Sequence, residues 1–268
     1  MVRRLGANIW SIPRRLRDPI KFLRKVAELG YEGAELAVDD SDLRLSLSEL
    51  RSKWGALREE ASSLGLELPS IASGLFWLRN MVVEPEKALE VVRVECEVAS
   101  VVGASIILVV PGVAVSDIPY EEHFIRVAKA LKEASRVARE YGVYVGIEPV
   151  WNRLFPSPLD FRRLLEEVGE DNVKLYFDVG NTLPHSLPEH WIRSLKDWLV
   201  QVHVKDFSID ELKFTPPGLG SVNWSAVKSA LDEVGYNGWL VAELPWGPEE
   251  EPYKYLVDTA KFVRESLM

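Results

Sequence analysis

The sequence predicts a closed (β/α)8 barrel, the TIM-barrel fold, formed by a single domain over residues 1–268. Short runs rich in β-branched residues alternate about eight times with longer segments of helical periodicity. The strand-like runs are almost entirely apolar, as in strands that are covered on both faces. The chain of 268 residues is also close to the roughly 250 residues typical of such a barrel.

The alternation defines eight strands and eight helices. We expect the strands at residues 5–10, 33–38, 68–73, 105–110, 143–149, 173–181, 200–207 and 239–245. The helices are expected at residues 19–29, 47–64, 85–102, 120–141, 159–168, 188–198, 224–234 and 252–267. No linker rich in Pro, Gly or Ser divides this series, which indicates one domain.

The residues at the helix ends support these boundaries. Asp18 followed by Pro19 is typical of an N-cap and the first helical residue. Six glycines follow expected helices, where a left-handed residue ends a helix: Gly30, Gly65, Gly103, Gly142, Gly169 and Gly235. The alternative topology is an open doubly wound sheet. The sequence lacks both Gly-x-Gly-x-x-Gly after the first strand and a Walker A motif, so the barrel is favoured.

Composition excludes several classes of function. The 32 basic and 41 acidic residues give a net charge of −9, which disfavours binding to nucleic acid or an anionic membrane. The single cysteine, Cys96, excludes an internal disulfide and a cysteine-rich metal site. Neither a membrane-length apolar run nor a signal peptide is present, so we expect a cytoplasmic protein. Many charges and a single glutamine favour a thermophilic source.

Four consecutive strands end in a carboxylate or an imidazole: Glu148, Asp178, His203 and Glu243. In a (β/α)8 barrel the carboxyl ends of the strands meet at one mouth, where the chemistry takes place. Three carboxylates brought together repel one another unless a cation is bound. The sequence therefore predicts one divalent metal ion held by these four residues. This ligand set suits Mn²⁺, Mg²⁺ or Co²⁺, with Zn²⁺ as a further alternative, and we expect Mn²⁺.

Glu148 and Glu243 are the expected catalytic residues. Their strands lie on opposite sides of the predicted barrel, so the two carboxylates would flank a substrate above the metal. One glutamate would remove a proton next to a carbonyl and the other would return it, through an enediolate stabilised by the metal. The alternative is that both glutamates only bind metal and a third residue is the base.

The strand-end motifs resemble the xylose isomerase-like TIM-barrel superfamily, and in particular its sugar phosphate isomerase/epimerase group. The segments that carry the resemblance are Ile-Glu148-Pro, Phe-Asp178-Val-Gly-Asn, His203-Val-Lys-Asp206, the segment from Pro217 to Trp224, and Ala-Glu243. The resemblance implies metal ligation by the same four residues and a dual role for the two glutamates. It implies an isomerase or epimerase that acts on a sugar or a sugar-like hydroxy-ketone, and it allows a homo-oligomer.

Three departures separate the chain from the ketose 3-epimerases of that group. Asn181, Ile209 and Leu154 stand where those enzymes carry a His, an Arg and a Glu that contact the sugar. The Lys205-Asp206 pair is more similar to inosose dehydratase, so a lyase is the alternative. An endonuclease IV-like nuclease is a remote alternative, because the chain has only four histidines and is acidic. A non-catalytic binding barrel is the other remote alternative.

Further residues are expected to bind the substrate because they follow or end strands: Trp10, Glu35, Trp77, Asn181, His185, Lys205 and Asp206. Aromatic side chains after strands are expected to form the wall of an apolar pocket: Trp10, Phe76, Trp77, Trp151 and Trp246. Residues 208–222 are expected to form a loop over the site. His123 and His190 lie in helical patterns and are expected to be exposed.

Overall fold

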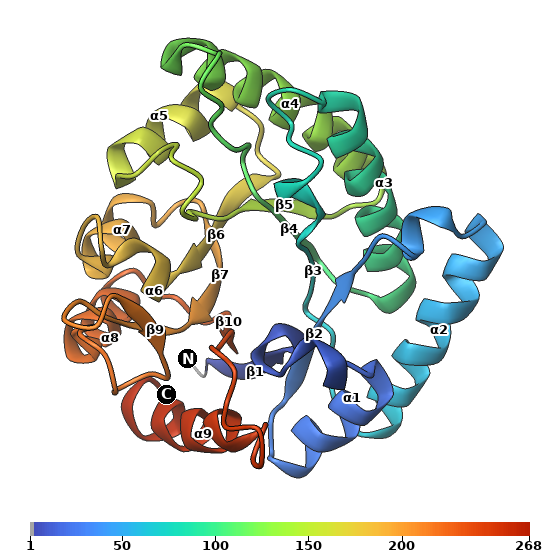
Figure 1. Ribbon diagram of the computed structural model, residues 1–268, viewed down its shortest axis with the longest axis vertical. Coiled ribbons are helices and arrows are strands. Elements are labelled where there is room, and N and C mark those ends of the chain that lie inside the picture. Colours follow the sequence, from blue (N-terminus) through green and yellow to red (C-terminus); the bar gives the residue numbers. More distant parts are fainter. Residues whose placement is uncertain (1–2) are drawn as a thin grey trace.

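The computed structural model describes residues 3–268 as a closed barrel of eight parallel strands inside a ring of helices (Figure 1). Each barrel strand pairs with the next one in the chain, and β1 closes the barrel against β10. The barrel strands are β1 (Arg4–Asn8), β2 (Gly33–Val38), β3 (Ser70–Ser73), β4 (Ile106–Val109), β5 (Tyr144–Ile147), β6 (Val173–Asp178), β7 (Leu199–Val204) and β10 (Trp239–Ala242). The predicted fold class is confirmed.

The outer helices pack their apolar faces against these strands. They are α1 (Pro19–Glu28), α2 (Leu47–Ser63), α3 (Pro85–Val102), α4 (Tyr120–Glu140), α5 (Pro158–Val168), α7 (Pro188–Ser194), α8 (Trp224–Glu233) and α9 (Lys254–Ser266). As predicted, the Asp18 carboxylate caps α1 by accepting the amide hydrogen of Lys21 at 2.9 Å. All six glycines predicted at helix ends adopt a positive φ, which a side chain would disfavour.

Most of the predicted strands run past the ends that the structure shows, and local side-chain bonds explain two of these ends. Asp178 ends β6 because its carboxylate accepts the amide hydrogen of Asn181 at 2.7 Å and caps a short helix, α6 (Val179–Thr182). The strand expected at 5–10 stops at Asn8, whose side chain accepts the Trp10 amide hydrogen and begins the 3-10 turn η1 (Ile9–Ser11).

The segment after β7 also differs from the prediction. Strand β8 (Asp206–Ser208) leaves the barrel and pairs antiparallel with β9 (Lys213–Thr215), so residues expected at a strand end and in a loop form a hairpin. The sixth predicted helix, 188–198, ends at Ser194.

The expectation for His123 is wrong. Its ring is buried under the segment before α4, where it contacts the Val115 amide and the Pro119 carbonyl oxygen, both at 2.9 Å. His190 is exposed, as expected. Within residues 3–268, no helix is both long and apolar enough to cross a membrane.

Candidate active site

The four predicted metal ligands meet at the mouth of the barrel formed by the carboxyl ends of the strands. Glu148 directly follows β5, Asp178 ends β6, His203 lies near the end of β7, and Glu243 directly follows β10. One ligand atom from each residue lies within 4.8 Å of the other three. Asp178 and His203 are fully buried and Glu148 nearly so, whereas the Glu243 side chain is 18% exposed. The cluster therefore faces the mouth through Glu243.

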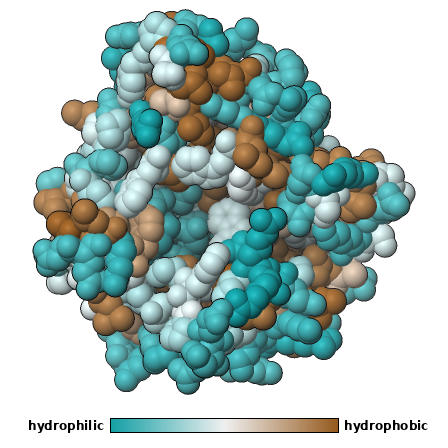
Figure 2. All heavy atoms as spheres, in the orientation of Figure 1, coloured by the Kyte–Doolittle hydropathy of each residue, from teal (hydrophilic) through white to brown (hydrophobic). Residues whose placement is uncertain are grey.

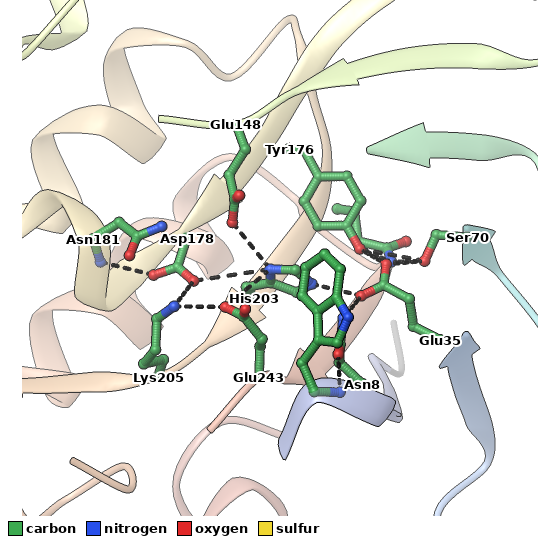
Figure 3. A network of polar contacts seen from close by, with 12 residues as sticks. Asn8, Glu35, Ser70, Glu148, Tyr176, Asp178, Asn181, His203, Lys205 and Glu243 are labelled. Carbon is green, nitrogen blue, oxygen red and sulfur yellow. Dashed lines mark hydrogen bonds and ion pairs between the residues drawn. The ribbon is translucent and has the colours of Figure 1, made fainter. Parts of the chain in front are cut away.

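His203 forms the centre of this cluster (Figure 3). Its Nδ1 lies 3.1 Å from Glu148 Oε1, 3.7 Å from Glu243 Oε2 and 3.8 Å from Asp178 Oδ2. Asp178 Oδ2 is buried, and the nearest donor to it is the Lys205 ammonium group at 3.0 Å. Three carboxylate oxygens and one imidazole nitrogen gathered this closely fit a divalent cation.

Lys205, directly after β7, supplies the positive charge nearest to the carboxylates. Its Nζ lies 2.5 Å from Glu243 Oε2 and 3.0 Å from Asp178 Oδ2, and 4.6 Å from the centre of the Phe214 ring. Burial lowers the pKa of Lys205, but the neighbouring carboxylates outweigh burial and raise it. The ammonium group therefore stays charged and shares two carboxylates with any cation bound in the cluster.

The two glutamates differ in their protonation in the absence of metal. Burial raises the pKa of Glu148 to about 7, against the opposing effect of His203. Burial also raises the pKa of Glu243, but Lys205 and His203 outweigh it and bring the pKa to about 2. At neutral pH Glu243 is therefore an ionised carboxylate, whereas Glu148 is protonated in about half of the molecules.

Glu35 lies beneath the cluster, inside the barrel, and is fully buried. Its Oε2 lies 2.8 Å from His203 Nε2, and Ser70 donates a hydrogen bond to its Oε1 at 2.6 Å. Asn8 and Tyr176 also donate to this carboxylate. Glu35 was expected to bind substrate, but the imidazole separates it from the mouth. Glu35 accepts a hydrogen bond from the Nε2–H of His203, which orients the ring so that Nδ1 faces the three carboxylates.

Glu35→Gln should weaken Mn²⁺ binding by about 10- to 100-fold, because the charge that orients and polarises the imidazole is lost. Glu95→Gln is the matched control. Glu95 is also fully buried, its pKa is raised well above the usual range by burial, and its oxygens have no hydrogen-bond partner within residues 3–268. Titration of metal-stripped protein with Mn²⁺, followed by electron paramagnetic resonance, measures both. Equal affinities in the two variants would contradict the role given to Glu35.

Metal affinity should rise with pH, because a cation must displace protons from Glu148 and His203. The pKa of Glu148 is about 7. Burial lowers the pKa of His203, but Glu35 and Glu148 outweigh it and raise the pKa well above its usual range. Each proton that the metal displaces makes the affinity rise by up to about tenfold per pH unit. Because Glu148 carries a proton mainly below pH 7, the affinity should rise more steeply with pH below 7 than above it. Calorimetric Mn²⁺ titrations between about pH 5.5 and 8 test this; an affinity independent of pH would contradict it.

Aromatic side chains surround the cavity of about 310 Å³ above the cluster. Trp10, Trp77 and Trp151 line it, as predicted. The other two predicted aromatic residues do not: Phe76 is buried, and Trp246 is 57% exposed away from this cavity. Phe214 of β9 lines the cavity and stacks on Trp151 with ring centres 4.9 Å apart. The sequence contained no signal for Phe214, because a three-residue strand in an expected loop is not visible as a pattern.

The remaining predicted substrate-binding residues divide between the cavity and its surroundings. Asn181 and Lys205 line the cavity. Asp206 does not, because its carboxylate accepts four hydrogen bonds from the segment that follows: the amides of Phe207, Gly218 and Val222 and the indole of Trp224. It fixes the hairpin and the start of α8. His185 is exposed and borders a neighbouring surface hollow.

Residues 23–265 match the family model of the xylose isomerase-like TIM barrel. The chain therefore belongs to the xylose isomerase-like TIM-barrel family, whose members share the barrel fold described above. Among curated proteins, it is similar to the inosose dehydratase of Klebsiella pneumoniae (strain 342), with 29% identity over 168 residues. That alignment covers 54% of this chain and 56% of the relative, so it spans about half the length of each.

Solved structures show the same fold over nearly the whole chain. D-psicose 3-epimerase from Clostridium cellulolyticum H10 superposes with a TM-score of 0.78 at 19% identity, covering 98% of this chain and 99% of that one. The 3-keto-D-glucoside 4-epimerase of E. coli superposes with a TM-score of 0.75 at 16% identity, covering 98% and 99%. At these identities the likeness concerns the fold alone.

Proposed function

We propose that this chain is an enzyme that binds one divalent metal ion at Glu148, Asp178, His203 and Glu243 and isomerises or epimerises a small sugar-like hydroxy-ketone. The observation that carries the proposal is the gathering of these four ligand groups within 4.8 Å, beneath a cavity of about 310 Å³. We propose Mn²⁺ as the ion; Mg²⁺, Co²⁺ and Zn²⁺ fit the same ligand types. The named epimerases among the structural neighbours are consistent with this chemistry.

The two glutamates are placed for opposite proton transfers. Strands β5 and β10 are separated in the barrel by β6 and β7, so Glu148 and Glu243 approach the cavity from different sides. A bound divalent cation would polarise a carbonyl oxygen and stabilise the charge that develops when the neighbouring carbon loses a proton. One glutamate takes that proton, and the other delivers one to carbon. Delivery to the opposite face of the same carbon gives the epimer. Delivery to the former carbonyl carbon gives the isomer, with the adjacent hydroxyl group losing its proton to become the new carbonyl and the former carbonyl oxygen gaining one.

Other residues of the cavity orient the substrate and limit water. Lys205 places an ammonium group beside Glu243, where it can bind an oxygen that carries developing negative charge. Asn181 offers an amide to substrate hydroxyl groups. Trp10, Trp77 and Trp151 supply flat apolar walls against which the carbon face of a sugar packs.

A dehydratase of the inosose type is the second candidate. The curated relatives that carry this name favour it. In that reaction one glutamate removes a proton next to the carbonyl, and the hydroxyl group on the following carbon leaves as water after protonation. Lys205 is a charged hydrogen-bond donor beside Glu243, can stabilise the departing oxygen, and supports this alternative as well.

Proton exchange distinguishes the candidates. Ketoses, inososes and 2-keto acids are incubated with Mn²⁺-loaded protein in D₂O and followed by nuclear magnetic resonance. An isomerase or epimerase introduces deuterium next to the carbonyl and forms an isomer of the substrate. A dehydratase instead forms a product that has lost the elements of one water molecule. Protein stripped of metal is the control and should be inactive. Binding without exchange for every compound would indicate a non-catalytic barrel.

A further inference from the structure

The cavity above the metal cluster continues into a second lobe of about 640 Å³. The lobe shares Trp10, Trp77 and Glu243 with the first cavity, so a ligand can extend from one into the other. Figure 2 shows a hollow at the centre of this face, bordered by hydrophilic atoms where the segment after β1 lies in Figure 1. The proposed chemistry at the cluster uses only the first cavity.

Two arginines from the segment after β1 line this lobe. Arg14 and Arg17 both border it, and neither forms an ion pair within residues 3–268. Arg17 is half-buried and donates to the carbonyl oxygens of Ile12 at 3.0 Å and Trp10 at 3.2 Å, which fixes its guanidinium group. Arg15 lies between them in the sequence but does not line the lobe, and it pairs with Glu249 at 2.8 Å.

Two of the other charged groups that line the lobe, Lys53 and Asp39, have partners outside it. Lys53 Nζ lies 2.8 Å from Asp42 Oδ1. Asp39 accepts hydrogen bonds from the amide and hydroxyl groups of Ser41. Burial and then the proximity of Arg14 lower the pKa of Arg17, with Glu243 acting in the opposite direction. Two guanidinium groups therefore face one cavity without a dedicated acidic partner, in a chain whose net charge is −9.

We propose that the second lobe binds an anionic oxygen group of the substrate, a carboxylate or a phosphate, between Arg14 and Arg17. The guanidinium group is the side chain best suited to such groups, because it offers several donors in one plane. The inference rests on the proposed function, since the hydroxy-ketone end of the same molecule would lie at the metal cluster. It differs from the substrates named for the structural neighbours, which are uncharged sugars.

Three six-carbon ketoses test the charge preference: D-fructose, D-fructuronate and D-fructose 6-phosphate differ only in the group at carbon 6. Binding to the Mn²⁺-loaded protein is measured by calorimetry at low ionic strength, because salt screens the interaction. We expect one of the two anions to bind at least about tenfold more tightly than D-fructose, equivalent to about 1.4 kcal/mol. The anion that binds more tightly shows whether the lobe prefers a carboxylate or a phosphate group.

Arg14→Gln is the principal variant, because the Arg14 side chain makes no hydrogen bond or ion pair within the described part of the chain and its loss leaves the fold intact. Arg17→Lys is the second variant and keeps the charge but loses the fixed donor geometry. Arg15→Gln is the matched control. Arg14→Gln and Arg17→Lys should each lower the preference for the anion over D-fructose by about three- to tenfold and leave D-fructose binding unchanged. Arg15→Gln should change neither.

Equal binding of all three ketoses, or a preference that survives in both variants, would overturn the inference. This outcome is separate from failure of the proposed function, because binding is measured without turnover. Absence of deuterium exchange with all compounds would contradict the catalytic proposal, even where the anion preference is present.

Discussion

Glu243→Gln should lower the turnover of the metal-loaded enzyme by about 10²- to 10⁴-fold, the usual cost of losing a general acid or base. Glutamine retains an oxygen ligand and the shape of the side chain, but it cannot accept a proton. Glu243 is the more open of the two glutamates, and Lys205 and His203 bring its pKa to about 2, so it enters the reaction as a carboxylate. Turnover at saturating Mn²⁺, with metal occupancy measured in the same sample, separates catalysis from metal loss.

Glu148→Gln is the companion variant, and the comparison assigns the two roles. A variant that still exchanges deuterium into the substrate but forms no product has lost the residue that delivers the second proton. Near-full turnover in a fully loaded variant would show that the glutamate is only a ligand. The other glutamate would then have to be the base, because Lys205 stays charged, Glu35 is sealed beneath His203 and His185 lies outside the cavity.

His203→Ala should lower Mn²⁺ affinity by at least about 100-fold, because it removes the ligand at the centre of the cluster and leaves the Glu35 charge without its partner. Metal at a hundred times its dissociation constant stabilises the folded protein by about 2.7 kcal/mol, and the variant should lose most of this increment. Metal content and thermal unfolding with and without Mn²⁺ measure both effects.

His123→Ala is the matched control, since His123 is another buried histidine but lies away from the cluster. It should lower the stability of the metal-free protein and retain the stabilisation by metal. An unchanged metal affinity in His203→Ala would refute the assignment of His203 as a ligand.

The fold and the grouping of the four ligands were accessible from the sequence for one physical reason. In a parallel barrel all strands end at the same mouth, so polar residues that interrupt consecutive apolar runs must meet there. The register confirms this for neighbouring strands, because Asp178 pairs with His203 across β6 and β7. The same logic predicted Trp10 and Trp77 at the cavity.

Depth along the barrel axis was not accessible in the same way. Glu35 is paired in register with Asn8 and ends below the cluster, a level set by barrel stagger that a single strand does not reveal. Asp206 was misplaced because β8 leaves the barrel one residue after Lys205. Arg14 and Arg17 were missed because their role depends on how the segment after β1 folds over the mouth.

The most direct test of the account is a crystal structure of the Mn²⁺-loaded protein with anomalous scattering data that locate the metal. We expect a single anomalous peak, from one metal ion bound by one atom each of Glu148, Asp178, His203 and Glu243 at about 2.0–2.3 Å. His203 should bind through Nδ1, with Nε2 still bonded to Glu35. The absence of a peak among these four residues at saturating Mn²⁺, or a peak only elsewhere on the molecule, would contradict it.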